Sequence, residues 1–247
     1  MAELKQIVSY CDTHLAPGTF DDYCPNGLQV EGRAEVGHIV SGVTASQALL
    51  DRAVDAGADL VLVHHGYFWR GEPAPLVGLK ARRIRTLMSA GISLLAYHLP
   101  LDAHPQLGNN RQLGLRLGFD GAAAGDGLLW GVDLATPTTA GDLAGRVRSA
   151  LGREPLMIGD TAAALHRVAW CTGAAQGMLS QAVAGGFDAF VSGEISEQTV
   201  HEAREQGVVY LSAGHHATER YGVQALGERI ARQFNVRHSF IDIDNPV

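Results

Sequence analysis

The fold of this chain is indicated by a stretch of sequence that occurs twice. Residues 39–65 read IVSGVTASQALLDRAVDAGADLVLVHH, and residues 168–194 read VAWCTGAAQGMLSQAVAGGFDAFVSGE. The two stretches align without a gap, and seven of the 27 positions are identical, where chance would give about two. The identical pairs are Ala45/Ala174, Gln47/Gln176, Leu50/Leu179, Ala53/Ala182, Val54/Val183, Gly57/Gly186 and Asp59/Asp188.

The two copies also share the same order of structural signals. Each has a short apolar strand, a turn of small residues, a helix with apolar positions at i, i+3 and i+4, a glycine stop and a second apolar strand. Each copy is therefore predicted to form a βαβ unit. The predicted fold class is α/β, with an internal duplication and with helices on both faces of the sheets.

A second match lies downstream at an offset of 117 residues, because the first copy carries 12 extra residues around Tyr67 to Gly78. The segment AYHLPLD (96–102) then aligns with AGHHATE (213–219). Both segments follow a strand, and both place a histidine four residues before a carboxylate. We therefore expect His98 to be equivalent to His215, and Asp102 to Glu219.

The rest of the chain is expected to surround these two repeats. Helical spacing predicts helices over residues 3–15, 109–118, 139–151 and 218–234, and apolar runs predict strands in PLMIGD (155–160) and VRHSFIDI (236–243). The stretch GFDGAAAGDGLLWG (118–131) has too little periodicity for an element, so we place the join between the repeats there. The predicted division is residues 1–126 for the first repeat, with 225–247 packing back on it, and 127–224 for the second.

Composition limits the classes of function. Of the 247 residues, 46% are hydrophobic and 18% are charged, which excludes a mainly disordered chain. The net charge of −7 argues against strong binding to nucleic acids or to anionic membranes. No apolar run approaches the ~20 residues that span a bilayer, and the N-terminus lacks the pattern of a signal peptide, so we expect a cytoplasmic protein. Three cysteines without metal-ligand spacing are expected to be small buried side chains.

Two adjacent histidines end a predicted buried strand. LVLV (60–63) leads directly into His64 and His65, at the edge of the sheet where α/β proteins bind ligands. Neighbouring side chains at a strand end diverge, so two ions, each taking one imidazole, fit better than one ion taking both. The alternative is that both histidines cap the strand end and bond to backbone.

Three strand ends together supply five nitrogen or oxygen donors. They are His64 and His65 from the first, Asp102 from the second, and His215 and Glu219 from the third. A set rich in imidazole and carboxylate favours Zn, Fe, Mn, Co or Ni over Ca. The sequence predicts two divalent metal ions per chain and leaves their identity open.

Six motifs in order resemble one known family. They are DDYCPNGLQVEG (21–32), VTASQALLDRAV (43–54), LVLVHHGYFW (60–69), HLPLDAHPQLGNN (98–110), SGEISEQTVHEARE (192–205) and AGHHATER (213–220). Together they resemble the GTP cyclohydrolase 1 type 2 family, the dinuclear-metal-centre proteins. The resemblance implies two intertwined α/β repeats with mixed sheets, a toroidal homohexamer and a two-metal centre facing a cavity. It also implies the same five ligands.

Other residues near these motifs have two interpretations each. His98 is expected beside the ions, either in proton transfer or in packing, and His104 and His216 either at the rim or in structural roles. Glu194 and Glu197 could reach the cavity or could be solvated or helix-capping carboxylates. The run Tyr67–Arg70 could stack on a base and hold phosphate, or could form a subunit contact.

Two functions of different classes are consistent with these features. The preferred one is a hydrolase in which two divalent ions activate water against a purine nucleotide or a damaged derivative. The substrate class depends mainly on the resemblance. The alternative is a non-enzymatic scaffold or metal-handling protein, whose ions would be fully ligated by the protein.

Overall fold

The structure is a computed structural model that describes residues 1–124 and 127–247. The chain divides into two compact units. Unit 1 comprises Met1–Leu107 and Gly222–Asp244, and unit 2 comprises Gly108–Tyr221 and Asn245–Val247. The predicted boundary between the repeats, after residue 126, adjoins residues 125 and 126, which lie outside the described residues. That boundary stays a prediction.

The elements of unit 1 follow the predicted alternation of strands and helices. They are β1 (Ala2–Glu3), α1 (Leu4–Leu15), η1 (Pro17–Thr19), β2 (Gly27–Val30), β3 (Glu35–Val36), β4 (His38–Thr44), α2 (Gln47–Asp55), β5 (Leu60–His65), α3 (Gly78–Ala90), β6 (Ser93–Ala96), α4 (Leu99–Ala103) and β13 (Arg237–Phe240). The long helix α9 (His215–Phe234) begins in unit 2 and ends in unit 1.

The elements of unit 2 repeat this pattern. They are α5 (Asn109–Arg116), β7 (Ala122–Ala124), β8 (Leu129–Thr139), α6 (Ala140–Leu151), β9 (Leu156–Ile158), β10 (Ala164–Cys171), η2 (Gln176–Met178), α7 (Leu179–Ala184), β11 (Ala189–Ser192), α8 (Glu197–Gln206) and β12 (Val209–Ser212).

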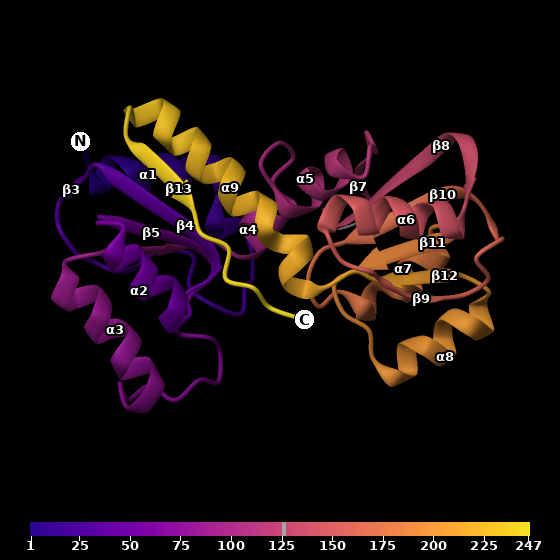
Figure 1. Cartoon of the computed structure of the whole chain (residues 1–247), viewed down its shortest axis with the longest axis horizontal. Coiled ribbons are helices and arrows are strands. Elements are labelled where there is room, and N and C mark those ends of the chain that lie inside the picture. The colour runs from indigo at the N-terminus through magenta and orange to yellow at the C-terminus, as the bar shows by residue number, and fades with distance from the viewer. Residues whose placement is uncertain (125–126) are drawn as a thin grey trace. The chain divides into compact units, whose positions relative to one another are not determined.

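Unit 1 is built on a five-stranded sheet in the order β13-β4-β5-β6-β2. The first four strands are parallel, and β2 runs antiparallel to β6. Successive residues of β5 face opposite sides, as strand geometry requires. Val61 and Val63 pack with side chains of α2 and α3, whereas Leu60 and Leu62 pack with α1 and the end of α9. Figure 1 shows these helices on the two faces of the sheet, as the sequence predicts.

Unit 2 is built on a six-stranded sheet in the order β7-β8-β10-β11-β12-β9. Strands β10, β11 and β12 are parallel, and β7, β8 and β9 are antiparallel to their neighbours. Trp170 packs on the face that α5 and α6 cover, and Phe190 and Tyr210 pack on the face of α7 and α8. Both units thus have mixed sheets flanked by helices, and the predicted α/β class is confirmed.

The duplication extends to individual hydrogen bonds. Ile39 pairs with Leu60 in unit 1, and Val168 pairs with Ala189 in unit 2, which is the same register at an offset of 129. The aspartate that the two copies share makes the same hydrogen bonds in both. Asp59 accepts hydrogen bonds from the backbone N–H groups of residues 37 and 38, and Asp188 accepts them from those of residues 166 and 167. These bonds explain the identity, because in both copies the carboxylate anchors equivalent backbone groups at the first strand.

The predicted offset of the third strand is wrong by one residue. Tyr97 N–H donates to the carbonyl of Val63, and Ala213 N–H donates to that of Ser192, so the offset is 116 rather than 117. Residue 98 therefore corresponds to Gly214, and Leu99 to His215. The 117 offset matches the spacing of histidine and carboxylate, but hydrogen bonding sets the register of a strand.

The sequence also makes predictions about the stretch 118–131 and about the cysteines. The stretch expected to lack an element contains β7 and the start of β8, which pair with each other, so that prediction is wrong. Thr139 caps α6, because its hydroxyl accepts the Asp142 N–H at 3.1 Å. All three cysteines are buried, as expected. None of the helices in the described part of the chain has the length and hydropathy to cross a membrane.

Candidate metal-binding site

The two histidines at the end of β5 are held in defined orientations. The His64 ring is completely buried, and its Nδ1 lies 2.9 Å from the carbonyl oxygen of Tyr97. A carbonyl oxygen only accepts, so Nδ1 carries the proton and donates it. The lone pair of a neutral His64 is then on Nε2, which is the usual arrangement of a histidine that binds a metal.

Asp102 supplies a carboxylate beside that nitrogen. It lies on the short helix α4, is buried, and places Oδ1 3.5 Å from Nε2 of His64. A divalent cation shared by the two atoms would satisfy a lone pair on each. This donor chemistry fits a metal site.

His65 follows as a second imidazole of the same strand end. Its Nδ1 lies 3.1 Å from the hydroxyl oxygen of Thr44, which directs Nε2 away from the strand pairing. The ring centroids of His64 and His65 are 4.6 Å apart, with the planes tilted by 45°. One nitrogen from each of His64, His65 and His98 lies within 4.8 Å of the other two.

Unit 2 holds the other predicted ligands on the first turns of α9. Nε2 of His215 lies 3.0 Å from Oε2 of Glu219, one helical turn later, and Glu219 is buried. Nδ1 of His215 lies 2.6 Å from Oε1 of Glu194. Backbone packs closely around these groups, because a Cβ on Gly193 would lie 2.7 Å from the Cα of His215. Gly193 corresponds to His64, so this close approach leaves the second repeat no room for a matching histidine.

The charge state of His215 reflects its two carboxylates. Burial alone would lower the pKa of His215, but the hydrogen bonds and charges of Glu219 and Glu194 together raise it to about 9. Below that pH the metal-free imidazole carries a proton on both nitrogens. A metal ion has to displace the proton on Nε2 before it can bind.

This linkage predicts how metal binding depends on pH. Metal affinity at His215 should rise by roughly tenfold per pH unit, because one proton is displaced, and should level off near pH 9, the pKa of the metal-free imidazole. Replacing Glu194 with Gln removes a charge that raises this pKa, so the plateau should begin at a lower pH. Calorimetric titration of metal-free protein in buffers of different protonation enthalpy would measure the released proton.

The Glu197→Gln variant is the matched control, because Glu197 is exposed and hydrogen-bonds His201 instead. A Glu194→Gln profile that coincides with the Glu197→Gln profile would refute the role of Glu194.

His98 lies next to these histidines although it is not equivalent to His215. Its ring centroid is 5.0 Å from that of His64 and 5.7 Å from that of His65. Its Nδ1 lies 2.7 Å from Oδ1 of Asp22, and its backbone N–H donates to the side chain of Asn26. His98 therefore lies beside the two predicted histidine ligands of unit 1. Its contacts with Asp22 and Asn26 hold it there, and the duplication does not explain its position.

Sequence reasoning missed Asp22, the carboxylate that orients His98. Its side chain is 3% exposed and accepts four hydrogen bonds. The donors are the N–H groups of Tyr23 and Leu99, the amide of Asn26 and the ring of His98. Burial would raise the pKa of Asp22, but the hydrogen bonds from His98 and Asn26 and the charge of His98 lower it to about 2. The only sequence signal is its position in the DDYCPNG segment.

The residues of the run Tyr67–Arg70, which follows the two histidines, make different contacts. Tyr67 is buried and donates its hydroxyl to the carbonyl of Ala45, so of the two interpretations of this run, stacking on a base does not hold for Tyr67. Trp69 places its ring centroid 5.1 Å from that of His98 and 5.9 Å from that of His65. Arg70 is paired with Asp21 at 2.7 Å and bonds the carbonyl of Asp22. The guanidinium thus joins this run to the segment that holds His98.

The remaining candidates have structural contacts. Nδ1 of His104 accepts the backbone N–H groups of residues 106 and 107, which completes the turn after α4. His216 is buried near the start of α9, and its backbone N–H donates to the carbonyl of Val247. Glu197 is exposed at the start of α8.

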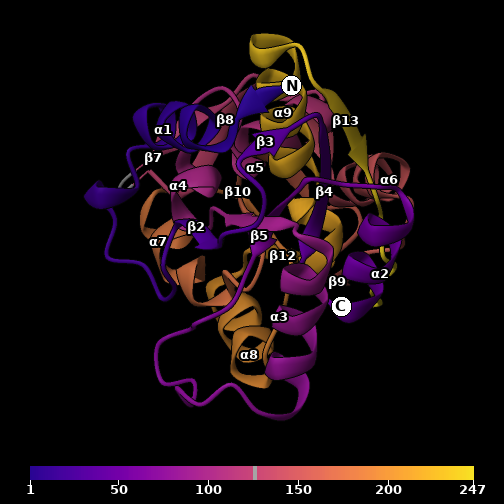
Figure 2. The same ribbon diagram turned by 90° about the vertical axis from the view of Figure 1, so that its left-hand side faces the viewer.

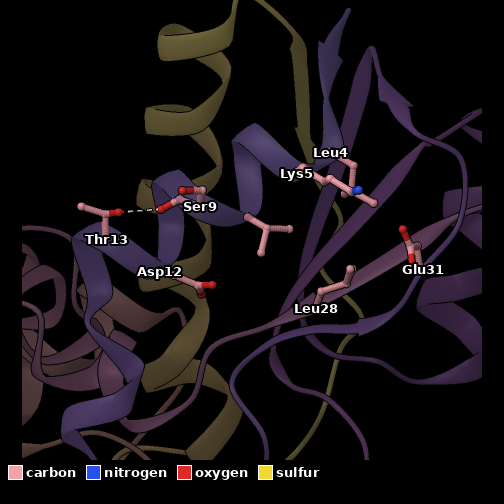
Figure 3. A pocket seen from close by; sticks show the side chains of 8 residues that line it. Leu4, Lys5, Ser9, Asp12, Thr13, Leu28 and Glu31 are labelled. Atoms are coloured by element: carbon pink, nitrogen blue, oxygen red, sulfur yellow. Dashed lines mark hydrogen bonds between the residues drawn. The ribbon is translucent and has the colours of Figure 1, made fainter.

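An open groove on unit 1 contains none of the predicted ligands. Figure 3 shows its lining, which comes from α1, β2 and the residue after β2 and includes Leu4, Lys5, Asp12, Leu28 and Glu31. It is an open surface with charges of both signs. The candidate site is identified by its donor atoms, and this groove is a separate feature of unit 1.

Comparison with known proteins agrees with the sequence motifs. The profile of a family described as Duf34/NIF3 (NGG1p interacting factor 3) matches residues 2–246. The chain is 56% identical to a GTP cyclohydrolase 1 type 2 homolog of Pseudomonas aeruginosa, over 98% of each chain. It is 50% identical to the protein of that name from Escherichia coli K12, over 99% of this chain and 98% of the other.

Solved structures of related proteins have the same fold. The chain superposes on protein ybgI, described as of unknown function, with a TM-score of 0.96, 48% identity and complete coverage of both chains. The protein TTHA1606 from Thermus thermophilus gives a TM-score of 0.92 at 34% identity, also over both whole chains.

Proposed function

The chain belongs to the Duf34/NIF3 family, and from this premise we propose that it is a hydrolase that depends on two divalent metal ions. The observation that carries the proposal is the pairing of His64 with Asp102. A buried imidazole whose Nδ1 proton is given to a carbonyl presents its Nε2 to a buried carboxylate 3.5 Å away. Two neighbouring acceptors of this kind are expected where a cation binds.

Each of the three proposed histidine ligands has a supporting contact. His64, His65 and His215 all have Nδ1 engaged by an oxygen, so each would use Nε2 to hold an ion. Asp102 and Glu219 supply the carboxylates, and either can bridge two ions, which an imidazole cannot do. These five residues stay the proposed metal ligands.

The proposed chemistry is hydrolysis of a purine nucleotide or a damaged nucleotide. Bound divalent ions would make water acidic enough to supply hydroxide near neutral pH and would polarise the group under attack. His98, oriented by Asp22, would give a proton to the leaving group from Nε2. Trp69 offers a ring beside His98 for a planar base. The relatives are named as homologues of a GTP cyclohydrolase, which supports the same substrate class. The homohexamer also stays a prediction.

The first test is the metal content. Gently purified protein should contain two divalent ions per chain, because five donors exceed what one tetrahedral ion requires. Elemental analysis should be combined with a screen for nucleotide hydrolysis with and without a chelator. Saturation at one ion would contradict the two-ion proposal, whereas two ions without chelator-sensitive turnover would favour the scaffold alternative.

Two substitutions test the division of ligands between the ions. Glu219→Gln should weaken the binding of both ions if its carboxylate bridges them, while His64→Ala should chiefly weaken one. Metal titration of each variant, with circular dichroism to confirm folding, would measure this. Equal loss of both ions from folded His64→Ala protein would show that the assignment is wrong.

A further inference from the structure

Helix α3 concentrates positive charge in a chain whose net charge is −7. Its sequence, GLKARRIRTLMSA, contains Lys80, Arg82, Arg83 and Arg85 and no acidic residue. Such a run creates a local positive field that is opposite in sign to the charge of the whole protein.

The four side chains differ in their surroundings. Nζ of Lys80 lies 3.4 Å from Oε2 of Glu72 and donates to the carbonyl of Pro73, so the ammonium group is already paired within the protein. Arg83 is half-buried and has its Nε in the interior. Arg82 and Arg85 are exposed, and neither forms an ion pair with any residue in the described ranges. These two guanidinium groups are available to a ligand.

The two arginines line a groove between α2 and α3. Figure 2 shows the two helices, which pack against each other within unit 1. The groove has a volume of about 500 Å³ and is lined by Gln47, Arg82, Arg85, Thr86 and Ser89. Its helix α3 residues are spaced three or four apart, so they share one face of the helix. The side-chain amide of Gln47 donates to the Thr86 hydroxyl at 3.0 Å and ties the two helices together.

We propose that this groove binds a small anion that carries a phosphate group. Two guanidinium groups provide forked N–H donors that match phosphate oxygens, and Ser89 adds a hydroxyl. The acidic balance of the chain and the nearby Asp51, which accepts a hydrogen bond from Gln47, oppose a long polyanion. A small anion avoids most of that repulsion. The groove uses none of the proposed metal ligands, so the two proposals are independent.

The test is calorimetric titration of the metal-loaded protein with pyrophosphate. The double variant Arg82→Gln/Arg85→Gln should bind pyrophosphate at least about tenfold more weakly, because each charge-assisted hydrogen bond it loses is stronger than a neutral one. Asp51→Asn should strengthen binding. Arg204→Gln is the matched control, because Arg204 is an exposed arginine on α8 outside the groove and should leave the affinity unchanged.

Other outcomes would overturn the proposal. An unchanged affinity in the double variant would assign all pyrophosphate binding to another place, such as the metal ligands. If the wild-type protein shows no binding at millimolar pyrophosphate, the groove is not an anion site. Tighter, strongly salt-dependent binding of a single-stranded oligonucleotide that the double variant abolishes would replace the small anion with a nucleic acid.

Discussion

Replacing His98 with alanine is expected to lower substrate turnover by about 10² to 10⁴ while most of the bound metal is retained, the usual loss for a general acid or base. The expectation follows from geometry. Asp22 engages Nδ1 of His98, so Nε2 is the free proton-transfer atom, and the ring lies 5.0 Å from that of His64. Turnover of the nucleotide found by screening should be measured together with metal content per chain.

The matched control is His104→Ala, since His104 bonds backbone N–H groups of its own turn and is expected to affect turnover little. A stoichiometric loss of one ion from the His98→Ala protein would make His98 a sixth ligand. Unchanged turnover with both ions in place would reduce His98 to a packing role.

The strands and helices near the duplication could be predicted because local sequence determines them. Apolar strands, a helix with one apolar face and a glycine stop recur in both copies, and the pairing of Ile39 with Leu60 reappears as that of Val168 with Ala189. The 116 offset of the third strand could not be predicted. It depends on backbone hydrogen bonds, and the identity of a few polar residues suggested a register one residue away.

The pairing of particular carboxylates with the histidines could not be predicted, for a different reason. Asp22 is 76 residues from His98 in the sequence, and Glu194 is 21 residues from His215. Only the folded chain brings each pair together, and an isolated aspartate or glutamate has no periodic signal. The proposed ligands are easier to predict, because each follows a recognisable buried strand.

The Trp170→Ala substitution is expected to destabilise the protein by about 3 to 5 kcal/mol, the usual cost of truncating a fully buried tryptophan. Trp170 is completely buried in β10, and its indole N–H donates to the carbonyl of Asn110 at 2.9 Å. The surrounding backbone is shaped to the ring. A Cβ on Gly121 would collide with the indole, and one on Gly114 would lie 2.6 Å from it. Alanine would therefore leave a cavity that Gly114 and Gly121 cannot fill. It would also remove the buried hydrogen bond from the indole N–H to the Asn110 carbonyl.

Urea unfolding followed by circular dichroism would measure this loss, with Leu156→Ala as the control. Leu156 is also a large apolar strand residue of unit 2, but it is 56% exposed and should cost less than about 0.5 kcal/mol, as surface substitutions usually do. Since Trp170 belongs to the core cluster of unit 2, the transition of that unit should shift to lower urea concentration. A loss similar to that of the Leu156→Ala protein would mean that the space around Trp170 collapses, and that the close contacts with Gly114 and Gly121 do not define the packing of this core.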